Sequence, residues 1–500
     1  MSNNKIYVSG FDDAQLLITL KLISQYCTKN NITDVILDSD VHDVSLFLRK
    51  TKEYKNFKSK FNIIKFKKIK KNNLVNLFFY LIVNFFKIIK ISTNLNRKKL
   101  LEKKINWFDC QINHSIWDSC YLFQNENRLM PSLISKFYYS IVIFTHIFYA
   151  KLLKSLNVKT VFMGHLVYAS KAKIAQFRKD KIKIIGHTSE SYFELKNHKD
   201  MMWMIINKDH INHLNKKLLN NYSYKYWKQR LLGYGTGEDT RVASKSKIKL
   251  KKEKYKNIMM LHIFRDSPFN YIDRNRIFSD YYEWVEKTLE ILCNSNETWI
   301  VRPHPNAQRW GENSEKIFWL IYKKVCLKTG KKPNILFEKK RVSNLEIFKT
   351  ASKILTFSGT PHIEAMCFGL KSIIISDVTL SAISKKLVLK PKNLKEYEKL
   401  ILNNNNLKIF KATKKENIFA KKILFITERT LSFQKQLNLR LIYRNDKNSK
   451  LINNFNNSLI KLRNRNTMSK LLNSFNYLDT KFKRTFSFDY LKLIKKKYRV

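Results

Sequence analysis

Arginine and histidine stand together in "RPHP", from Arg302 to Pro305, directly after the apolar run "WIV". The chain has only seven prolines, and each proline restricts its own backbone and that of the preceding residue. Two prolines around one histidine therefore predict a stiff loop at the end of a buried strand. On such a loop Arg302 can offer a fork of donors to a phosphate, and His304 can donate to a phosphate or protonate a leaving group.

A second candidate loop follows another apolar strand, in "TFSGTPHIEAMCFG". Ser358, Gly359 and Thr360 form a small turn with two hydroxyls, and Pro361 suits the first turn of a helix. The N–H groups at a helix N-terminus favour anions, and glycine allows the backbone to come close to them. Glu364 lies one turn further on, where a carboxylate suits the hydroxyls of a ribose.

Both loops need a parallel sheet behind them, because ligands bind at the carboxyl edge of open α/β sheets. The chain opens as strand, helix, strand, and a second α/β pattern begins near residue 255. We predict an α/β fold with two Rossmann-like domains in tandem, a helical insertion in the first and a helical C-terminal tail. The predicted parts are an acceptor-side domain at 1–235 with an insertion at about 45–155, a linker at 236–254, a nucleotide-sugar donor domain at 255–410 and a basic tail at 411–500.

The stretch from Asn257 to Asp377 resembles the donor half of bacterial capsule and surface polysaccharide biosynthesis proteins of the GT-B glycosyltransferase type. The resemblance rests on "HIFRDSPFNYID", "FSDYYEWVEKTL", "WIVRPHP" and "LTFSGTPHIEAMCFGLKSIIISD". It is similar to capsule Kdo transferases and, more distantly, to bacterial sialyltransferases and to the CDP-glycerol glycerophosphotransferases of teichoic-acid synthesis.

In those groups a His-Pro loop and a loop bearing Ser or Thr hold the nucleotide phosphate. His304 and Pro305 fit the first motif, and Ser358 and Thr360 fit the second. Sialyltransferases have adjacent hydroxyl residues there, whereas Gly359 separates them in this chain. The resemblance implies transfer of a sugar from a nucleotide-activated donor, with a CMP-sugar such as CMP-Kdo favoured, to a surface polysaccharide or lipid-linked acceptor.

Two alternatives stay open. One is a polyol-phosphate transferase of teichoic-acid type that uses a CDP-linked donor. The other is a non-catalytic basic protein that binds nucleic acid or anionic lipid, which a net charge of +57 would suit. We favour the enzyme without nucleic acid as a partner, because Lys and Asn are abundant and Gly and Pro scarce throughout, as an A/T-rich coding sequence produces.

The general base that deprotonates the acceptor hydroxyl is open among five residues. An inverting transfer needs a carboxylate or histidine within hydrogen-bond reach of that hydroxyl. The candidates are Asp12, Asp13, His165 and Glu190 in the first half and Asp266 in the second. We expect no cofactor and no metal, and interpret the DxD pattern in "LDSD" (37–40) as a polar strand-end loop.

Cysteine usage and apolar stretches bear on location. The six cysteines form no CxxC pair, and the N-terminus has no apolar run of signal-peptide type, which predicts a reduced, cytoplasmic protein. The stretches at 74–91 and 137–153 are interrupted by polar residues. Each predicts a buried core helix, which we favour, or a helix in the membrane interface rather than a span. The interface alternative would imply peripheral contact with the inner face of the plasma membrane.

Overall fold

The structure is a computed structural model of all 500 residues. It describes residues 4–9, 20, 23–24, 26–38, 52–122, 129–164, 168–187, 192–195, 223–224, 227, 256–266, 276–305, 307, 311–338, 344–376, 379–403 and 406–429. The described residues fall into two compact units. Unit 1 takes those within Met1–Cys120 and Pro131–Trp203, and unit 2 takes those within Tyr121–Met130 and Met204–Thr430.

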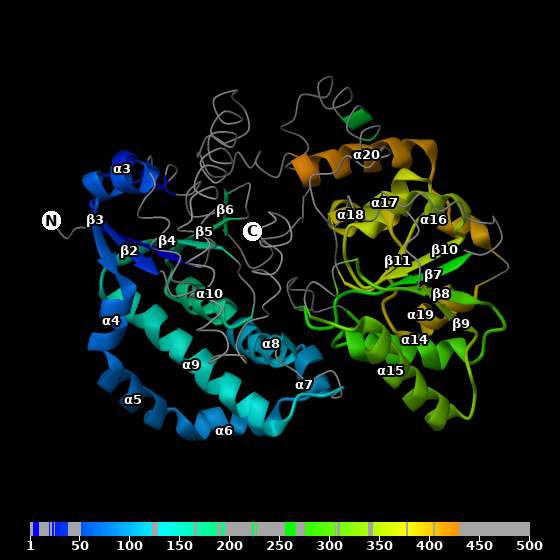
Figure 1. Cartoon of the computed structure of the whole chain (residues 1–500), viewed down its shortest axis with the longest axis horizontal. Coiled ribbons are helices and arrows are strands. Elements are labelled where there is room, and N and C mark those ends of the chain that lie inside the picture. The colour runs from blue at the N-terminus through cyan, green and yellow to red at the C-terminus, as the bar shows by residue number, and fades with distance from the viewer. Residues whose placement is uncertain are drawn as a thin grey trace, which may run out of the picture. The chain divides into compact units, whose positions relative to one another are not determined.

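Unit 1 is built on a six-stranded sheet of order β3-β2-β1-β4-β5-β6, in which only β6 runs antiparallel to its neighbour (Figure 1). The central strands are rich in β-branched and other apolar residues, and β1 buries four of its five residues. The strands are β1 Lys5–Ser9, β2 Asp34–Asp38, β3 Asn62–Lys65, β4 Val158–Gly164, β5 Lys183–His187 and β6 Tyr192–Glu194.

Helices occupy most of the chain between β3 and β4, as the sequence predicted for this part. They are α4 Phe66–Asn72, α5 Leu74–Val83, α6 Phe85–Asn94, α7 Arg97–Leu101, α8 Trp107–Leu122 and α9 Leu133–Ser155, with α3 Lys52–Lys60 before β3 and α10 Ser170–Lys179 after β4. The core-helix interpretation is correct for α9, which buries seven residues. It is wrong for α5, which buries none of its ten.

The first aspartate of the DxD pattern, Asp38, lies in the core of unit 1. Asp38 ends β2, and its carboxylate lies 3.2 Å from the Lys173 Nζ and 3.7 Å from the Lys70 Nζ. Burial opposes ionisation, but the positive charges of Lys173 and Lys70 outweigh it and lower the pKa of Asp38. Asp38 thus has lysine partners, while Asp40 lies outside the described residues.

Unit 2 is built on a five-stranded parallel sheet of order β11-β10-β7-β8-β9. The first strand, β7, lies in the middle, and the chain moves outward to β8 and β9 on one side before it crosses to β10 and β11 on the other. This is the doubly wound order, with its switch point between β7 and β10. The strands are β7 Asn257–Met260, β8 Trp299–Arg302, β9 Ile335–Phe337, β10 Lys353–Thr356 and β11 Ile373–Ile374.

Helices cover both faces of this sheet (Figure 1). One face packs against α16 and α17 through a cluster that includes Ile258, Phe348 and Ala365. Fully buried Trp284 of α14 donates from its Nε1 to the Tyr397 hydroxyl of α19 at 2.9 Å. The helices are α14 Tyr281–Leu292, α15 Ser314–Thr329, α16 Asn344–Thr350, α17 Pro361–Cys367, α18 Thr379–Ile383, α19 Leu394–Leu402 and α20 Lys414–Arg429.

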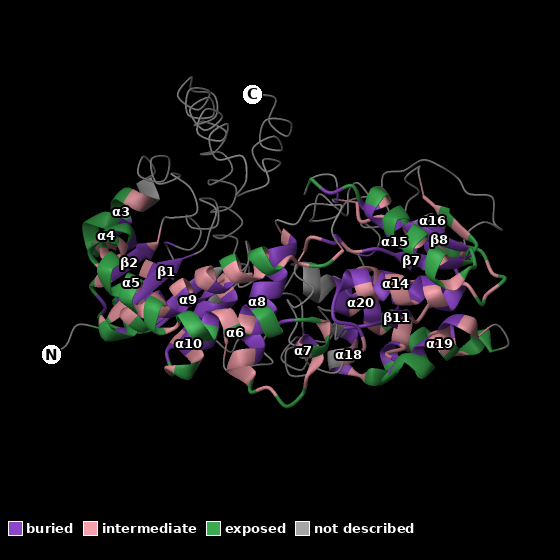
Figure 2. Ribbon diagram, turned by 90° about the horizontal axis from the view of Figure 1, so that it is seen from below, coloured by how far each residue is buried: buried purple, intermediate pink, exposed green. Residues whose placement is uncertain are grey.

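The two sheets, which are parallel except for β6, confirm the predicted α/β class with two Rossmann-like units. Within the predicted tail, α20 belongs to unit 2, because the Asn417 Nδ2 donates to the carbonyls of Met366 and Cys367 and Ala420 is fully buried. Figure 2 shows the buried strands and inward helix faces in each unit. The predicted linker at 236–254 and the tail beyond 429 lie outside the described residues, so the predicted boundaries stay a prediction.

Candidate active site

The two predicted loops leave the same edge of the unit 2 sheet. The "RPHP" loop follows β8, the Ser-Gly-Thr loop follows β10, and β7 lies between these two strands. With neighbouring strands about 4.8 Å apart, β8 and β10 are separated by roughly 10 Å. The two loops therefore flank the loop that follows β7, at the switch point of the sheet.

A row of aromatic rings crosses this edge from one loop to the other. The ring centroids of His304 and His262 are 5.5 Å apart, and the rings are tilted by 38°. His262 stacks on Tyr281 at 4.6 Å, and Tyr281 meets Phe357 edge-on at 4.7 Å. His262 follows β7 and Phe357 follows β10, so the row ties the three strand ends together.

His262 is held mainly as a neutral imidazole. Its side chain is 19% exposed, and the Asp266 Oδ2 lies 3.8 Å from its Nδ1. Desolvation lowers the pKa of His262, and the opposing effects of Asp266 and of the Ile263 carbonyl do not cancel it. A neutral imidazole beside His304 can accept a proton or a hydrogen bond at one ring nitrogen.

Arg302 lies at the sheet edge and forms an ion pair with a carboxylate of the same chain. Its Nη1 lies 3.3 Å from the Glu338 Oε1, and the two side chains are only 7% and 4% exposed. Glu338 directly follows β9, so the pair bridges two neighbouring strand ends. A buried guanidinium needs such a carboxylate, because an isolated charge in the interior is costly.

The Ser-Gly-Thr loop makes the tight turn that its sequence predicts. Gly359 has φ of +116°, a backbone conformation that L side chains rarely adopt. The Thr356 hydroxyl donates to the Ser358 carbonyl at 3.1 Å, and Thr360 precedes Pro361 at the start of α17. Ser358 is buried, whereas Gly359 and Thr360 are partly exposed.

The side chain of His362 contacts the backbone of this loop. Its Nδ1 contacts the Gly359 carbonyl, and its Nε2 is buried with no hydrogen-bond partner among the described residues. Burial lowers the pKa of His362 to about 4, against the effects of the Gly359 carbonyl and Glu364. His362 is therefore neutral at physiological pH, with Nδ1 as the protonated nitrogen.

Two carboxylates fix the neighbouring loops. The Glu364 Oε2 accepts from the Asn344 Nδ2 of α16 at 2.7 Å, and Glu364 is 8% exposed. Glu312, after β8, accepts from the Arg265 backbone N–H at 2.9 Å and from the Ser314 hydroxyl at 2.5 Å. Burial raises the pKa of Glu312 despite these bonds. Glu312 thus joins the loop after β7 to the loop after β8.

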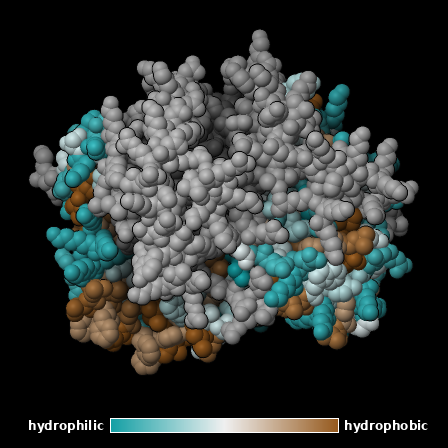
Figure 3. Space-filling view, in the orientation of Figure 1, coloured by the Kyte–Doolittle hydropathy of each residue, from teal (hydrophilic) through white to brown (hydrophobic). Residues whose placement is uncertain are grey.

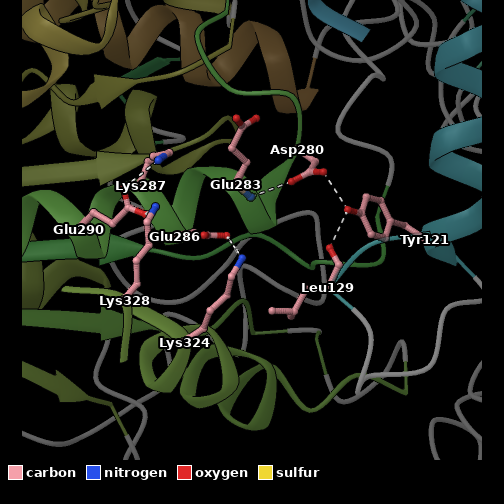
Figure 4. Close-up of polar contacts among 9 residues, drawn as sticks. All are labelled: Tyr121, Leu129, Asp280, Glu283, Glu286, Lys287, Glu290, Lys324 and Lys328. Atoms are coloured by element: carbon pink, nitrogen blue, oxygen red, sulfur yellow. Dashed lines mark hydrogen bonds and ion pairs between the residues drawn. The ribbon is translucent and has the colours of Figure 1, made fainter. Parts of the chain in front are cut away.

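The start of α14 positions Tyr281 in the ring row. Asp280 caps this helix by accepting from the Glu283 N–H at 2.7 Å, and its other oxygen accepts from the Tyr121 hydroxyl at 2.8 Å (Figure 4). The Tyr121 and Tyr282 rings stack at 4.7 Å. Asp280 is fully buried, so the cap sets the direction in which Tyr281 leaves the helix.

Ion pairs along α14 and α15 are of a different kind. Lys324 lies 2.8 Å from Glu286, and Lys328 lies 2.7 Å from Glu290 (Figure 4). The lysine side chains are about half exposed, and exposed pairs contribute roughly 0–1 kcal/mol. These ion pairs join the two helices, but they lie on the protein surface and are not part of the row of aromatic rings.

Of the five predicted general-base candidates, only Asp266 lies in the described residues. It stands in the loop after β7, close to His262. The other four, Asp12, Asp13, His165 and Glu190, lie outside the described residues. Which of the five acts as base stays a prediction.

Sequence reasoning overlooked His262 and Glu312. The sequence does place His262 in "MMLHIFRD", at the end of an apolar strand, in the same position that singled out His304. No comparable signal marks Glu312, because it lies ten residues beyond β8 and becomes important only when the chain folds back onto Arg265.

No protein-family model matches this chain, and no curated protein matches it. Solved structures resemble it loosely. The N-terminal domain of Candida albicans trehalose-6-phosphate phosphatase is 9% identical, with 92% of this chain and 97% of that chain covered and a TM-score of 0.30.

Two further solved structures carry nucleotide or sugar-transfer names. The Methanocaldococcus jannaschii UDP-GlcNAc 2-epimerase in complex with UDP-GlcNAc and UDP is 15% identical over 85% of this chain and 99% of that chain, with a TM-score of 0.27. The glycosyltransferase SnogD from Streptomyces nogalater is 8% identical over 88% and 100%, with a TM-score of 0.26. At such low TM-scores these likenesses assign no activity to this chain.

Proposed function

We propose that the chain is a GT-B-type glycosyltransferase that binds a nucleotide-activated sugar at the carboxyl edge of the unit 2 sheet. One observation carries the proposal. The His-Pro loop and the Ser-Gly-Thr loop flank β7 at the switch point of a doubly wound sheet, and His304 and His262 lie 5.5 Å apart there. Nucleotides bind at such switch points in open α/β sheets.

The proposed reaction needs charge stabilisation as the nucleotide leaves. His304 donates a hydrogen bond to the phosphate that carries the leaving charge, and the hydroxyl of Thr360 donates to the same phosphate from the opposite loop. His262 orients the His304 ring. No metal or cofactor is part of the proposal.

We favour a CMP-sugar such as CMP-Kdo as donor and a surface polysaccharide or lipid-linked glycan as acceptor. The support is the resemblance of "WIVRPHP" and "LTFSGTPHIEAMCFG" to capsule-type transferases. The proposed location is the cytoplasm, at the inner face of the plasma membrane.

A thermal-shift titration tests the donor site. The full-length protein is titrated with CMP, CDP, UDP, GDP and ADP, beside His304→Ala and the control Lys324→Gln on the surface of α15. A ligand that binds the folded state raises the melting temperature, by an amount that grows with its concentration relative to Kd. We expect a shift selective for one nucleotide in the wild type and the control, and its loss in His304→Ala.

A shift equal for all five nucleotides and unchanged in His304→Ala, or no shift at all, would overturn the site and favour the basic binding protein. Once a nucleotide is identified, product analysis separates the two transferase classes. A sugar without phosphorus in the product supports the glycosyltransferase. Transferred phosphorus would show a polyol-phosphate transferase and leave the nucleotide site standing.

A further inference from the structure

Unit 1 exposes a continuous row of large apolar side chains on α5 and the first turn of α6. Eight residues in a stretch of thirteen are between 46% and 82% exposed. We call them the apolar surface: Leu74, Val75, Phe78, Phe79, Ile82, Val83, Phe85 and Phe86. Figure 3 shows hydrophobic side chains gathered at the lower left, where Figure 1 places α5 and α6, with hydrophilic side chains next to them.

This surface is as large as the largest apolar patch that a typical soluble monomer exposes. A fully buried phenylalanine removes about 150–250 Å² from water, so the four phenylalanine rings, which are 46% to 82% exposed, together contribute on the order of 400 Å². The aliphatic residues add to this. Patches of that size mark contact with a protein, a ligand or a membrane.

Internal packing fixes the surface in place. The Ser92 hydroxyl of α6 donates to the Ser140 hydroxyl of α9 at 3.0 Å, and the Lys136 Nζ donates to the Leu95 carbonyl at 2.9 Å. The Tyr80 and Phe148 rings lie 5.4 Å apart. Because α5 and α6 pack against α9 on one side, their other sides form the exposed surface.

The charged residues in the chain segment that carries this surface are all positive. Between Glu53 and Glu102 the sequence has thirteen Lys and Arg residues and no Asp or Glu. Lys67, Lys68 and Lys71 of α4 are exposed immediately before α5, and Lys87 and Lys90 follow on α6. A second copy of the same surface would repel these lysines, whereas lipid phosphates attract them.

Helix geometry decides between crossing a membrane and lying on it. The described helix α9 is long and apolar enough to cross, and α5 with α6 forms a second candidate, but that pair is bent by 59°. At 1.5 Å per residue, ten-residue α5 is about 15 Å long, half the hydrocarbon thickness of about 30 Å. α9 buries one side within unit 1.

We propose that the apolar surface inserts in the plane of an anionic lipid bilayer, with the lysines of α4 at the phosphate level. Phenylalanines enter the boundary between headgroups and acyl chains, as in amphipathic helices that lie on membranes. The proposal concerns unit 1 alone and does not depend on the nucleotide site.

Vesicle co-sedimentation of the full-length protein tests the proposal. Vesicles of phosphatidylcholine with about one-third phosphatidylglycerol are compared with phosphatidylcholine alone, at low and at about 0.5 M salt. The test variant is Phe79→Ser/Phe86→Ser, which keeps the net charge. The matched control is Leu327→Ser on α15, an apolar residue that is 78% exposed in unit 2.

We expect binding to anionic vesicles that persists in part at high salt, a fall of about tenfold or more in the double variant, and none in the control. Lys67→Gln/Lys68→Gln/Lys71→Gln is expected to lose the preference for anionic lipid. Equal binding of the wild type and the serine variant would overturn the proposal, because the basic charge of the chain alone would then explain adsorption.

Light scattering without lipid tests whether a second copy of the chain, rather than a membrane, binds the apolar surface. A monomeric wild type supports the proposal. A wild-type dimer that the serine variant turns into monomers would instead identify the surface as a self-association interface and overturn the membrane assignment. Unchanged thermal unfolding of the serine variant shows that its fold is intact.

Discussion

The imidazole ring of His262 lies between His304 and Tyr281, with centroid distances of 5.5 Å to the first and 4.6 Å to the second. The three residues come from the end of β7, the end of β8 and the start of α14. Stacking on Tyr281 fixes the plane of His262, and His262 in turn limits where the His304 ring can lie. A residue in the loop after the middle strand, His262, therefore packs against the histidine that is predicted to bind phosphate in the neighbouring loop.

This arrangement predicts different effects for two substitutions of His262. His262→Phe keeps a ring to stack on Tyr281 and should leave nucleotide affinity within a few fold of wild type. His262→Ala removes the ring and should weaken affinity about tenfold or more, as misplaced positioning groups do. Calorimetric titration of both variants with the preferred nucleotide measures this. Equal losses would mean that the imidazole nitrogens of His262 contact the ligand themselves.

Substitutions in the Arg302–Glu338 pair can distinguish a structural role of Arg302 from a phosphate-binding role. Glu338→Gln leaves a buried guanidinium without its carboxylate and should lower the free energy of unfolding by about 3 kcal/mol. Arg302→Met/Glu338→Leu replaces the pair by apolar groups and should recover most of that loss. Urea denaturation measures both.

Nucleotide affinity of the double variant then tests the predicted contact of Arg302 with phosphate. We expect a fall of about tenfold if the guanidinium reaches the ligand. A double variant that is stable and binds nucleotide like the wild type would assign Arg302 to the sheet edge alone.

The sequence predicts those parts of unit 2 that depend on interactions between residues close together in the chain. An apolar strand followed by Pro or Gly is recognisable from neighbouring residues, and so the loops at His304 and Gly359 could be placed at strand ends. The sequence does not reveal that β7 lies between β8 and β10. Strand order depends on which face of the sheet each connecting helix covers. This order is what makes His262 a neighbour of His304.

Exposure is the other quantity that local pattern does not give. The stretch at 74–91 is as apolar as that at 137–153, and the same two interpretations suited both. In the structure α9 has α6 and α10 to pack against, whereas the outer side of α5 has no covering element among the described residues. Composition cannot distinguish a helix that finds a partner from one that does not.

His362 predicts a loss of stability in acid. Its pKa is lowered from 6.5 to about 4, so the folded state binds a proton less readily than the unfolded state. The stabilisation is complete above pH 6.5 and is lost as the pH falls toward 4, by an amount of about 3 kcal/mol. His362→Asn keeps a donor for the Gly359 carbonyl but does not titrate.

Urea denaturation of wild type and His362→Asn between pH 7.5 and about 4 checks this prediction. The wild type should lose more stability than the variant over this range. Other groups, including buried His146, whose pKa burial lowers to about 3, are common to both proteins and cancel in the comparison. Parallel curves would show that folding does not lower the pKa of His362, and would contradict this prediction.

Gly359 predicts a coupling between backbone conformation and ligand binding. A methyl group at this position would meet the Pro361 Cδ at 3.4 Å, which is an ordinary contact, so crowding is small. The strain comes from φ of +116°, which an alanine rarely adopts, and should cost about 1–3 kcal/mol. Gly359→Ala can relieve it by moving the loop that carries Ser358 and Thr360.

The matched control is Gly330→Ala at the end of α15. Gly330 has φ of +67°, and a methyl group there meets nothing within 4 Å. Gly330→Ala should lower stability by about 1 kcal/mol and leave nucleotide affinity unchanged. Gly359→Ala should lower both, since its loop flanks the proposed phosphate site. Thermal unfolding with and without nucleotide measures the two effects together, and equal ligand-induced shifts in the two variants would remove the Ser-Gly-Thr loop from the donor site.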